Sequence, residues 1–465
     1  MSNESADDEV KRSLRERCRT MSTDSLDDIA KDLSRVHQTQ LGFEDVVFSR
    51  FPIMSQMVSF CIYSVSLVFR MVKWFRFWWW TVQLSFRTIV WVIPLLPALL
   101  PYAVAYFRDR RICRRIRFGS TPREHLDVYV PEQATQAVNS QGKKVPVVIA
   151  VMGGGFLIGH RSYNVQLGLR CLDLGIIFVC IDYRNFPFAQ IPDMVENISR
   201  GIRWVFQNIE SFGGDLDNIM LTGQSAGAHL TATALLEHCL LEAKHAKAQM
   251  LGNSRDDEDF DCWSVRQLKM YLGVSGPYDI ERMAPFIGLP PRALNWLTMG
   301  NPDGCSPGFL VSSDEWKAVA ESAAGLLPPL HLFHGQDDKL VPAYTSVDFA
   351  EHLRAAGIGV TLDVRPGLNH TYAVIEGPAV RHDIQLELIL PALLGKGAEE
   401  RLIAQTPLKP MVPRSVVKVA AFCSPFGKVS RPYLDFAVEH VLLLAALMVL
   451  IISCIISMCM KLLSS

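Results

Sequence analysis

Ser225 lies at the centre of a short motif, Gly223-Gln224-Ser225-Ala226-Gly227, which reads Gly-x-Ser-x-Gly. An apolar run over 218–222 precedes this motif, and we expect a helix to begin at Ala226. Between a strand and a helix, such a turn presents the serine hydroxyl as a nucleophile above the end of a sheet. The flanking glycines fit a turn that has no room for a Cβ. The motif alone is also compatible with a turn that carries no chemistry, so the chain must still supply an oxyanion hole, an acid and a histidine.

A glycine run, Met152-Gly153-Gly154-Gly155-Phe156, follows the strand expected at 145–151. Acyl transfer passes through an oxyanion, and backbone N–H groups can stabilise that charge where no Cβ blocks the approach. We therefore predict that the N–H groups of Gly154, Gly155 and Ala226 form the oxyanion hole. Met152 stands where such loops usually carry histidine. The alternative, a phosphate-binding loop, is disfavoured because neither Gly-Lys-Ser/Thr nor Gly-x-Gly-x-x-Gly is present.

The acid is expected after a later strand, and the run that follows 330–333 fits. It reads His334-Gly335-Gln336-Asp337-Asp338-Lys339-Leu340-Val341-Pro342 and matches the pattern HGxxDxxVP, in which the acid is Asp338. Asp337 is then a turn residue and remains the alternative acid. We expect His334 to be structural, because it ends the strand on the wrong side of the turn.

The predicted base is His370, in Gly367-Leu368-Asn369-His370, after the strand expected at 360–364. A histidine on that loop can reach the serine across the strand ends, with Nδ1 on Asp338 and Nε2 on Ser225 Oγ. His229, one turn past the serine on the expected helix, and His382, in a charged run, are the competitors. We expect the first to pack and the second to be solvated. The order Ser, Asp, His is that of the α/β-hydrolases.

The elements that must position these residues alternate between strand and helix from 118 to 396, which indicates an α/β domain with a mostly parallel sheet. Residues 248–262 are predicted to be a polar loop, and 280–316 either a lid over a lipophilic pocket or an ordinary connection. The expected strands are 125–130, 145–151, 176–181, 219–221, 269–274, 330–333 and 360–364. The expected helices are 194–208, 226–247, 345–355 and 383–394.

The ends of the chain differ in composition from this domain. Residues 1–50 are polar and are predicted to be disordered, whereas 51–107 contain two apolar stretches, about 51–69 and 88–107. The first of these either spans a bilayer or lies in its near interface. After a linker at 397–440, residues 441–460 are free of charge and long enough to span. Arginines concentrated at 108–117 favour the cytosolic side, where we expect the catalytic domain to lie.

Composition limits the remaining possibilities. The 465 residues are enough for one large α/β domain with accessory segments, and 49% of them are hydrophobic. The net charge of −1 provides no overall field that would attract nucleic acid. The 11 cysteines show neither CxxC pairs nor metal-ligand spacing, so we expect reduced thiols and no metal. No organic cofactor is needed for the predicted chemistry.

Four segments of the chain resemble the isoprenylcysteine methylesterase family of α/β-hydrolase carboxylesterases. They are Gly153–Gly159, Asp182-Tyr183-Arg184-Asn185-Phe186-Pro187, the block from Gly213 to His229, and Tyr271–Tyr278. Lipase-like esterases usually carry Leu-Ala in place of Asn185-Phe186, which favours the prenylcysteine group. Phe156 departs from the Ala-Trp pair expected in that group, and the C-terminal apolar segment and long N-terminal arm are additions.

The resemblance implies a serine carboxylesterase that hydrolyses prenylcysteine methyl esters, on free prenylcysteine or on a prenylated protein. It also implies an endoplasmic reticulum or Golgi membrane protein with its catalytic domain facing the cytosol. A broad lipid esterase resembling arylacetamide deacetylase is the alternative within enzymes. A protein that uses the hydrolase fold only for interactions is a more distant alternative, because such proteins normally have a broken triad.

Overall fold

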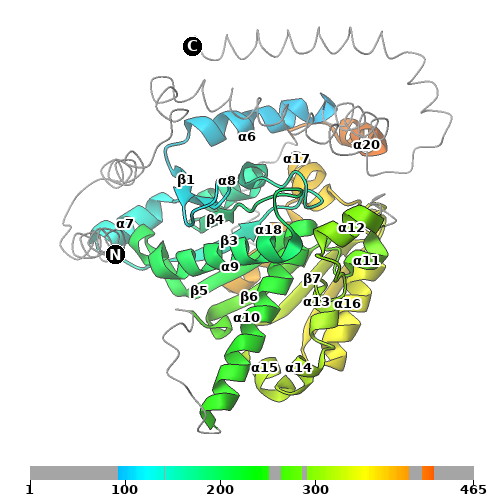
Figure 1. The fold of residues 1–465 in the computed structure, drawn as a ribbon. Helices are drawn as coiled ribbons and strands as arrows, with labels where there is room; N and C mark the ends of the chain where they lie inside the picture. The colour runs from blue at the N-terminus through cyan, green and yellow to red at the C-terminus, as the bar shows by residue number, and fades with distance from the viewer. Residues whose placement is uncertain are drawn as a thin grey trace, which may run out of the picture.

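The computed structural model describes residues 93–140, 142–250, 263–284, 291–395, 397 and 411–423. Their core is an eight-stranded sheet in the order β1-β2-β4-β3-β5-β6-β7-β8, with helices on both faces (Figure 1). β1 and β2 pair antiparallel, β2 pairs antiparallel with β4, and every later pairing is parallel. This arrangement confirms the predicted α/β-hydrolase fold in the described part of the chain.

Seven of the strands coincide with the predicted ones. In β2 to β7 most residues are buried, as expected for strands covered on both faces, whereas β8 is only partly buried. β5 is longer than expected, since its pairing with β3 extends back to Gly214. The strands are β1 (Ile112–Arg117), β2 (His125–Tyr129), β3 (Val145–Val151), β4 (Ile177–Ile181), β5 (Gly214–Gln224), β6 (Leu268–Val274), β7 (Leu330–Gly335) and β8 (Val360–Arg365).

Two groups of helices enclose the sheet, and an apolar core lies beneath each group. The first group is α9 (Ile191–Asn208), α10 (Ala226–Met250) and α16 (Tyr344–Ala355), whose buried side chains pack in the larger core. The second group is α8 (Val165–Asp173) and α18 (Ile384–Leu394), which pack on the opposite face. A peripheral helix, α7 (Glu132–Ser140), joins β2 to β3. Neither α7 nor α8 was among the expected helices.

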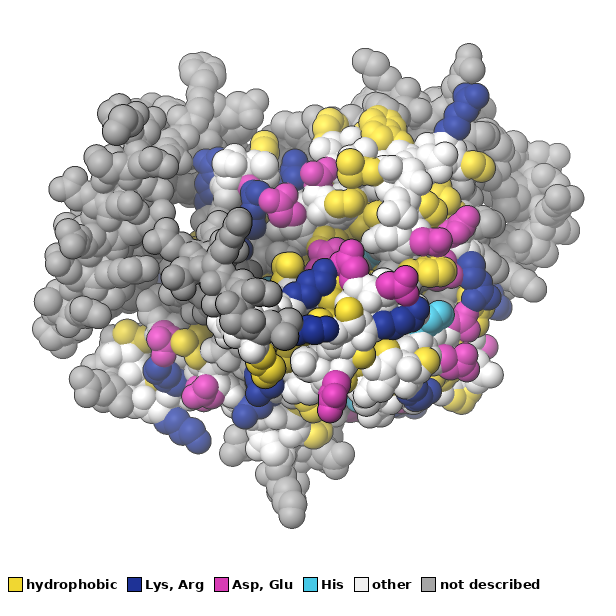
Figure 2. Space-filling model, turned by 60° about the horizontal axis from the view of Figure 1, so that its bottom comes forward, with side chains coloured by type: hydrophobic (Ala, Val, Ile, Leu, Met, Phe, Trp, Pro, Cys, Tyr) yellow, Lys and Arg dark blue, Asp and Glu magenta, His cyan; other side chains and the backbone are white. Residues whose placement is uncertain are grey.

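β1 was not predicted, because its sequence, Ile-Cys-Arg-Arg-Ile-Arg, was interpreted as part of a basic cluster beside a membrane. It forms the edge of the sheet, where arginine side chains can reach solvent. The sheet therefore begins at Ile112, before the expected domain start at 118. On the face shown in Figure 2, acidic and basic side chains are interspersed with apolar ones.

The described residues nearest the two chain ends pack together. Helix α6 (Leu96–Arg108) follows the short turn η1 (Ile93–Leu95), and α20 (Arg414–Cys423) lies beside it (Figure 1). They share a small apolar cluster that contains Leu95, Ala98, Val417 and Ala420. Part of the expected linker 397–440 is thus helical and packed.

The expected membrane segments lie largely outside the described residues. Positions 51–69 and 441–460 are outside them entirely, as is the arm at 1–50, and of 88–107 the structure describes 93–107. No helix in the described ranges combines the length and hydropathy needed to cross a bilayer.

The region expected to be a lid or a connection, 280–316, is described except for 285–290. It contains α11 (Ile280–Met283), α12 (Pro291–Leu297), α13 (Pro307–Leu310) and the start of α14 (Asp314–Lys317), and α15 (Ala320–Leu326) follows it. Leu294 and Leu297 of α12 are buried in the larger core. The polar loop expected at 248–262 begins after α10 ends at Met250, and 251–262 lie outside the described residues.

Candidate active site

Ser225 stands at the sharp turn between β5, which ends at Gln224, and α10, which begins at Ala226. Its backbone φ is +53°, a left-handed conformation that residues other than glycine rarely adopt. A Cβ on Gly223 would lie 2.4 Å from the carbonyl oxygen of Gly227, and one on Gly227 would lie 2.2 Å from that of Val151. The two glycines are therefore steric requirements, as the motif predicted.

The loops at the ends of β5, β7 and β8 bring Ser225, Asp338 and His370 together. The hydroxyl of Ser225 donates to Nε2 of His370 at 2.9 Å. Nδ1 of His370 donates to Oδ2 of Asp338 at 2.6 Å. All three residues are buried, which removes competing water from both hydrogen bonds. This is the geometry in which a histidine can take the serine proton while a carboxylate orients its ring.

Asp338 is held as a carboxylate by its surroundings. Its Oδ1 accepts from the backbone N–H groups of Leu340 at 3.0 Å and Val341 at 2.8 Å. Burial by itself raises its pKa, but the charge of His370 and hydrogen bonds from His334 and His370 outweigh burial and lower the pKa to about 2. An ionised Asp338 can stabilise an imidazolium on His370.

The structure separates this acid from its competitor. Asp337 is exposed, and its N–H donates to the carbonyl of Leu368 at 3.0 Å, so it acts as a turn residue. His382 is partly exposed beside Glu387, at 3.2 Å, and so lies at the surface as expected.

Two other buried histidines, His229 and His334, lie close to the triad. His229 is buried, with Nδ1 at 2.7 Å from the carbonyl oxygen of Pro277 and Nε2 at 2.8 Å from that of Cys305. It thereby connects α10 to the 280–316 region. His334 is buried as well, and its Nε2 lies 3.3 Å from Oδ2 of Asp338. The prediction that His334 is structural omitted this contact with the acid.

The glycine run forms a tight loop against the nucleophile. A Cβ on Gly153 would lie 2.6 Å from Cβ of Ser225, which shows how closely the two backbones approach. Gly154 and Gly155 have φ of +144° and +59°, conformations that favour glycine. Ala226 is the first residue of α10, where a helix leaves its N–H without an intrahelical acceptor. The predicted oxyanion donors thus lie on the two segments that meet at Ser225.

Arg123 and Asn185 bind the far end of this loop, at Gly159, and reasoning from sequence did not assign them to the site. Arg123 Nη2 and Asn185 Nδ2 both donate to the carbonyl of Gly159, at 2.5 and 3.1 Å. Their partners are distant in sequence, so the only signal was that Asn185 belongs to the segment Asp182–Pro187 that marks the resemblance.

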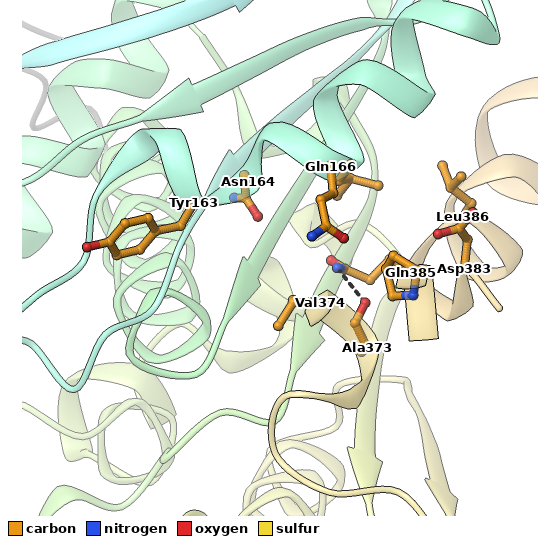
Figure 3. Close-up of a pocket in the computed structure, with 10 residues that line it drawn as sticks. Tyr163, Asn164, Gln166, Ala373, Val374, Asp383, Gln385 and Leu386 are labelled. Atoms are coloured by element: carbon orange, nitrogen blue, oxygen red, sulfur yellow. Dashed lines mark hydrogen bonds between the residues drawn. The ribbon is translucent and has the colours of Figure 1, made fainter. Parts of the chain in front are cut away.

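Figure 3 shows a small cavity beside the loop that carries His370. Tyr163 and Gln166 line it from one side, and Ala373, Val374 and Gln385 from the other. Its volume of about 10 Å³ is that of a single water molecule. The cavity is therefore too small for an ester substrate, and no triad residue lines it. Within the described residues there is no group of three or more His, Cys, Asp or Glu that could hold a metal ion.

Comparison with known proteins places this geometry in a family. Residues 126–353 match the family described as BD-FAE. Isoprenylcysteine alpha-carbonyl methylesterase ICME of Arabidopsis thaliana is 35% identical over 338 residues, which cover 71% of this chain and 74% of that protein. The probable isoprenylcysteine alpha-carbonyl methylesterase ICME of Oryza sativa subsp. japonica is 36% identical over 302 residues, 64% of this chain and 67% of that protein.

Among solved structures, esterase B from Lactobacillus rhamnosis aligns with a TM-score of 0.46 at 20% identity, over 66% of this chain and 92% of that one. The two plant proteins match most of their own length, and their similarity extends over most of this chain. The chain belongs to the isoprenylcysteine methylesterase family and is a carboxylic ester hydrolase.

Proposed function

We propose that this protein is a membrane-anchored serine esterase that hydrolyses prenylcysteine methyl esters through an acyl-enzyme. The observation that carries the proposal is the continuous hydrogen-bonded chain from Ser225 through His370 to Asp338, in a protein whose relatives are named isoprenylcysteine methylesterases. The prenylcysteine methyl ester, as substrate, is the partner that this proposal requires.

The reaction follows from the positions of these three side chains. Oγ of Ser225 attacks the ester carbonyl carbon while Nε2 of His370 takes its proton. The N–H groups of Gly154, Gly155 and Ala226 stabilise the oxyanion. The imidazolium of His370, stabilised by Asp338, then protonates the methoxide oxygen, and methanol leaves an acyl-serine. Water that gives a proton to His370 attacks this acyl group, and Ser225 recovers its proton as the carboxylic acid leaves.

Apolar side chains around the oxyanion loop support a lipophilic substrate. Phe156 is buried in the loop, and Phe186 packs edge-on against Trp296 of α12 with ring centroids 5.1 Å apart. Ile158 and Phe188 expose 36% and 61% of their surfaces nearby in the chain. Exposed large apolar residues close in sequence to the oxyanion loop and to the segment that binds it suit a hydrocarbon chain better than a polar substrate.

Two observations support membrane anchoring. Apolar stretches precede η1 and follow α20 in the sequence, and η1, α6 and α20 share one apolar cluster. The described residues nearest in sequence to these stretches therefore lie at the same edge of the domain. Ala379, nine residues beyond His370 in the sequence, belongs to this cluster too. The arginines at 108–117, most of which lie in or beside β1, follow the second apolar stretch in the sequence, and basic residues beside a membrane segment favour the cytosolic side. The proposed location is therefore an endoplasmic reticulum or Golgi membrane with the catalytic domain in the cytosol.

The test is a methyl-ester assay with the purified full-length protein in detergent. We expect kcat/KM for farnesylcysteine methyl ester to exceed that for a short nitrophenyl ester and for an acylglycerol by at least tenfold. Equal or lower values for the prenylcysteine ester would reassign the protein as a broad lipid esterase, the alternative that the sequence also allowed.

A Ser225→Ala variant provides the mechanistic control. It should fold, lose at least about a thousandfold in kcat, and fail to react with a fluorophosphonate probe. If the native protein itself does not react with that probe, a non-catalytic interaction role replaces the proposed one.

A further inference from the structure

The oxyanion loop is fixed at its far end, at Gly159, by contacts that the triad does not use. The loop folds back on itself, because the carbonyl of Gly154 accepts from the N–H groups of Leu157 and Ile158, both at 3.0 Å. A Cβ on Gly154 would lie 2.3 Å from the amide nitrogen of Gly159. Gly154 and Gly159 are thus in close contact across this turn, and a displacement of one moves the other.

The carbonyl of Gly159 accepts hydrogen bonds from two side chains that lie on different segments of the chain. Arg123 Nη2 donates at 2.5 Å from the segment before β2, and Asn185 Nδ2 donates at 3.1 Å from the loop after β4. One of these donors carries a full positive charge, which strengthens the hydrogen bond. A third hydrogen bond joins the oxyanion loop to the loop after β4, because the N–H of Phe186 donates to the carbonyl of Phe156 at 2.8 Å.

Arg123 is itself held by a buried network of ion pairs. Its Nε and Nη2 bind both oxygens of Asp182, at 2.9 and 2.5 Å. Asp182 also accepts from Arg161 at 3.0 Å, and Arg161 binds Asp127 at 2.8 Å. The hydroxyl of Tyr106, on α6, donates to Asp127 at 2.7 Å. Two arginines and two aspartates balance in charge, so the network can remain buried without an unpaired ion.

We propose that Arg123 and Asn185 are positioning residues for the hydrolysis: they hold Gly159 and, through it, set the Gly154 and Gly155 amides at the distance the oxyanion requires. This inference rests on the proposed function, in which those amides stabilise the oxyanion. Oxyanion donors act only within about 2.7–3.1 Å of the charge, so a small shift of the loop weakens the transition state more than the ground state.

Arg123 and Asn185, together with the Gly159 carbonyl that they bind, form a clamp on the oxyanion loop. The variant that tests this clamp is Asn185→Leu, which keeps the branched shape and the number of side-chain heavy atoms and removes the donated hydrogen bond. Asn164→Leu is the matched control. Asn164 is equally buried, with 6% exposure against 5% for Asn185, but it donates to the sulfur of Cys180 instead of the loop. Both variants are made in the full-length protein and assayed with nitrophenyl acetate, so that the result does not depend on preference for a prenyl chain.

If Arg123 and Asn185 position the oxyanion donors, their loss should weaken transition-state stabilisation and leave ground-state binding of the ester nearly unchanged. In Asn185→Leu, kcat should fall about tenfold with KM changed less than twofold. The affinity for a trifluoromethyl ketone, which forms an oxyanion adduct with the serine, should fall by the same factor as kcat/KM. Inhibition by the acetate product should stay unchanged. Asn164→Leu should match the native protein in all four measurements while showing a similar change in thermal midpoint.

Two results would overturn the clamp. One is an Asn185→Leu variant that keeps native kcat and trifluoromethyl ketone affinity; the other is an equal loss in Asn164→Leu, which would indicate general destabilisation. Arg123→Lys supplies a second test, because it keeps the charge but loses the fork that binds both Asp182 and Gly159, and it should lower kcat more than KM. If the native protein shows no Ser225-dependent turnover, the proposed function fails first, and the failure is distinguishable from that of the clamp.

Discussion

Nε2 of His334 lies 3.3 Å from Oδ2 of Asp338, the same carboxylate oxygen that accepts the hydrogen bond from His370 Nδ1 at 2.6 Å. The ring of His334 is fixed on its other side, where Nδ1 accepts from the hydroxyl of Ser346 at 2.6 Å. Its Nε2 also donates to the carbonyl of Val341 at 2.7 Å. Val341 in turn donates its N–H to Asp338, so His334 closes the loop that carries the acid.

Replacing His334 with alanine should therefore loosen Asp338 without removing it. We expect about a tenfold fall in kcat and a loss of about 2 kcal/mol in the free energy of unfolding, because the buried Val341 carbonyl loses its donor. His370→Ala should instead lower kcat to the level of Ser225→Ala. Steady-state kinetics and urea unfolding of the two variants measure the contrast. Equal losses of kcat in both variants would show that His334 has more than this supporting role.

The adjacent aspartates give a second prediction, with a built-in control. Asp338→Asn should lower kcat by about 10⁴, because an amide cannot hold His370 in the tautomer that accepts the serine proton. Asp337→Asn should leave kcat within twofold of the native value, since only the backbone of Asp337 has a role in the turn. The test is kcat/KM of both variants on one ester. A large loss in Asp337→Asn would reverse the assignment of the acid.

The third prediction concerns acid stability. The pKa of Asp338 is lowered to about 2 from 3.8, so its ionised form stabilises the folded state. This contribution, about 2 kcal/mol at roughly 1.4 kcal/mol per pKa unit, is complete above pH of about 4 and is lost as the pH falls towards about 2. The difference in unfolding free energy between the native protein and Asp338→Asn should therefore shrink over that range. Denaturant titrations that stay parallel from pH 5 to pH 2.5 would contradict it.

The sheet and the triad were predictable because they depend on local patterns. The residues of β3 to β7 are mostly buried, and the nucleophile, acid and base each follow a predicted strand of the sheet. Asp338 was separable from Asp337 because the turn fixes its register relative to Val341 and Pro342. In each case the catalytic residue and the strand that positions it lie within about ten residues of one another in the sequence.

The features that sequence reasoning missed depend on contacts between distant segments. Arg117 and its neighbours in β1 have the composition of a membrane-proximal basic cluster, and only pairing with β2 makes them an edge strand. Arg123, Arg161 and Asp182 each resemble a surface charge until the fold brings them together in one network. No spacing in the chain links these positions, so the clamp behind the oxyanion loop could be found only from the three-dimensional structure.

The last prediction separates two neighbouring glycines of the oxyanion loop. Gly155 has φ of +59°, and a Cβ there would meet no atom within 4 Å. Gly155→Ala should therefore fold, with a cost of about 1 kcal/mol for the left-handed backbone, and keep kcat within about tenfold. Gly154 has φ of +144°, and its Cβ would lie 2.3 Å from the amide nitrogen of Gly159, which cannot yield without moving the loop.

Gly154→Ala should accordingly lower kcat by more than a hundredfold, because the strain displaces the backbone amides that bind the oxyanion. The measurement is kcat together with trifluoromethyl ketone affinity for both variants, with thermal midpoints to verify folding. If Gly155→Ala is the more damaging of the two, either the backbone N–H at position 155 has been displaced or the added methyl group blocks the substrate. Either result would place the ester carbonyl closer to Gly155 than to Gly154.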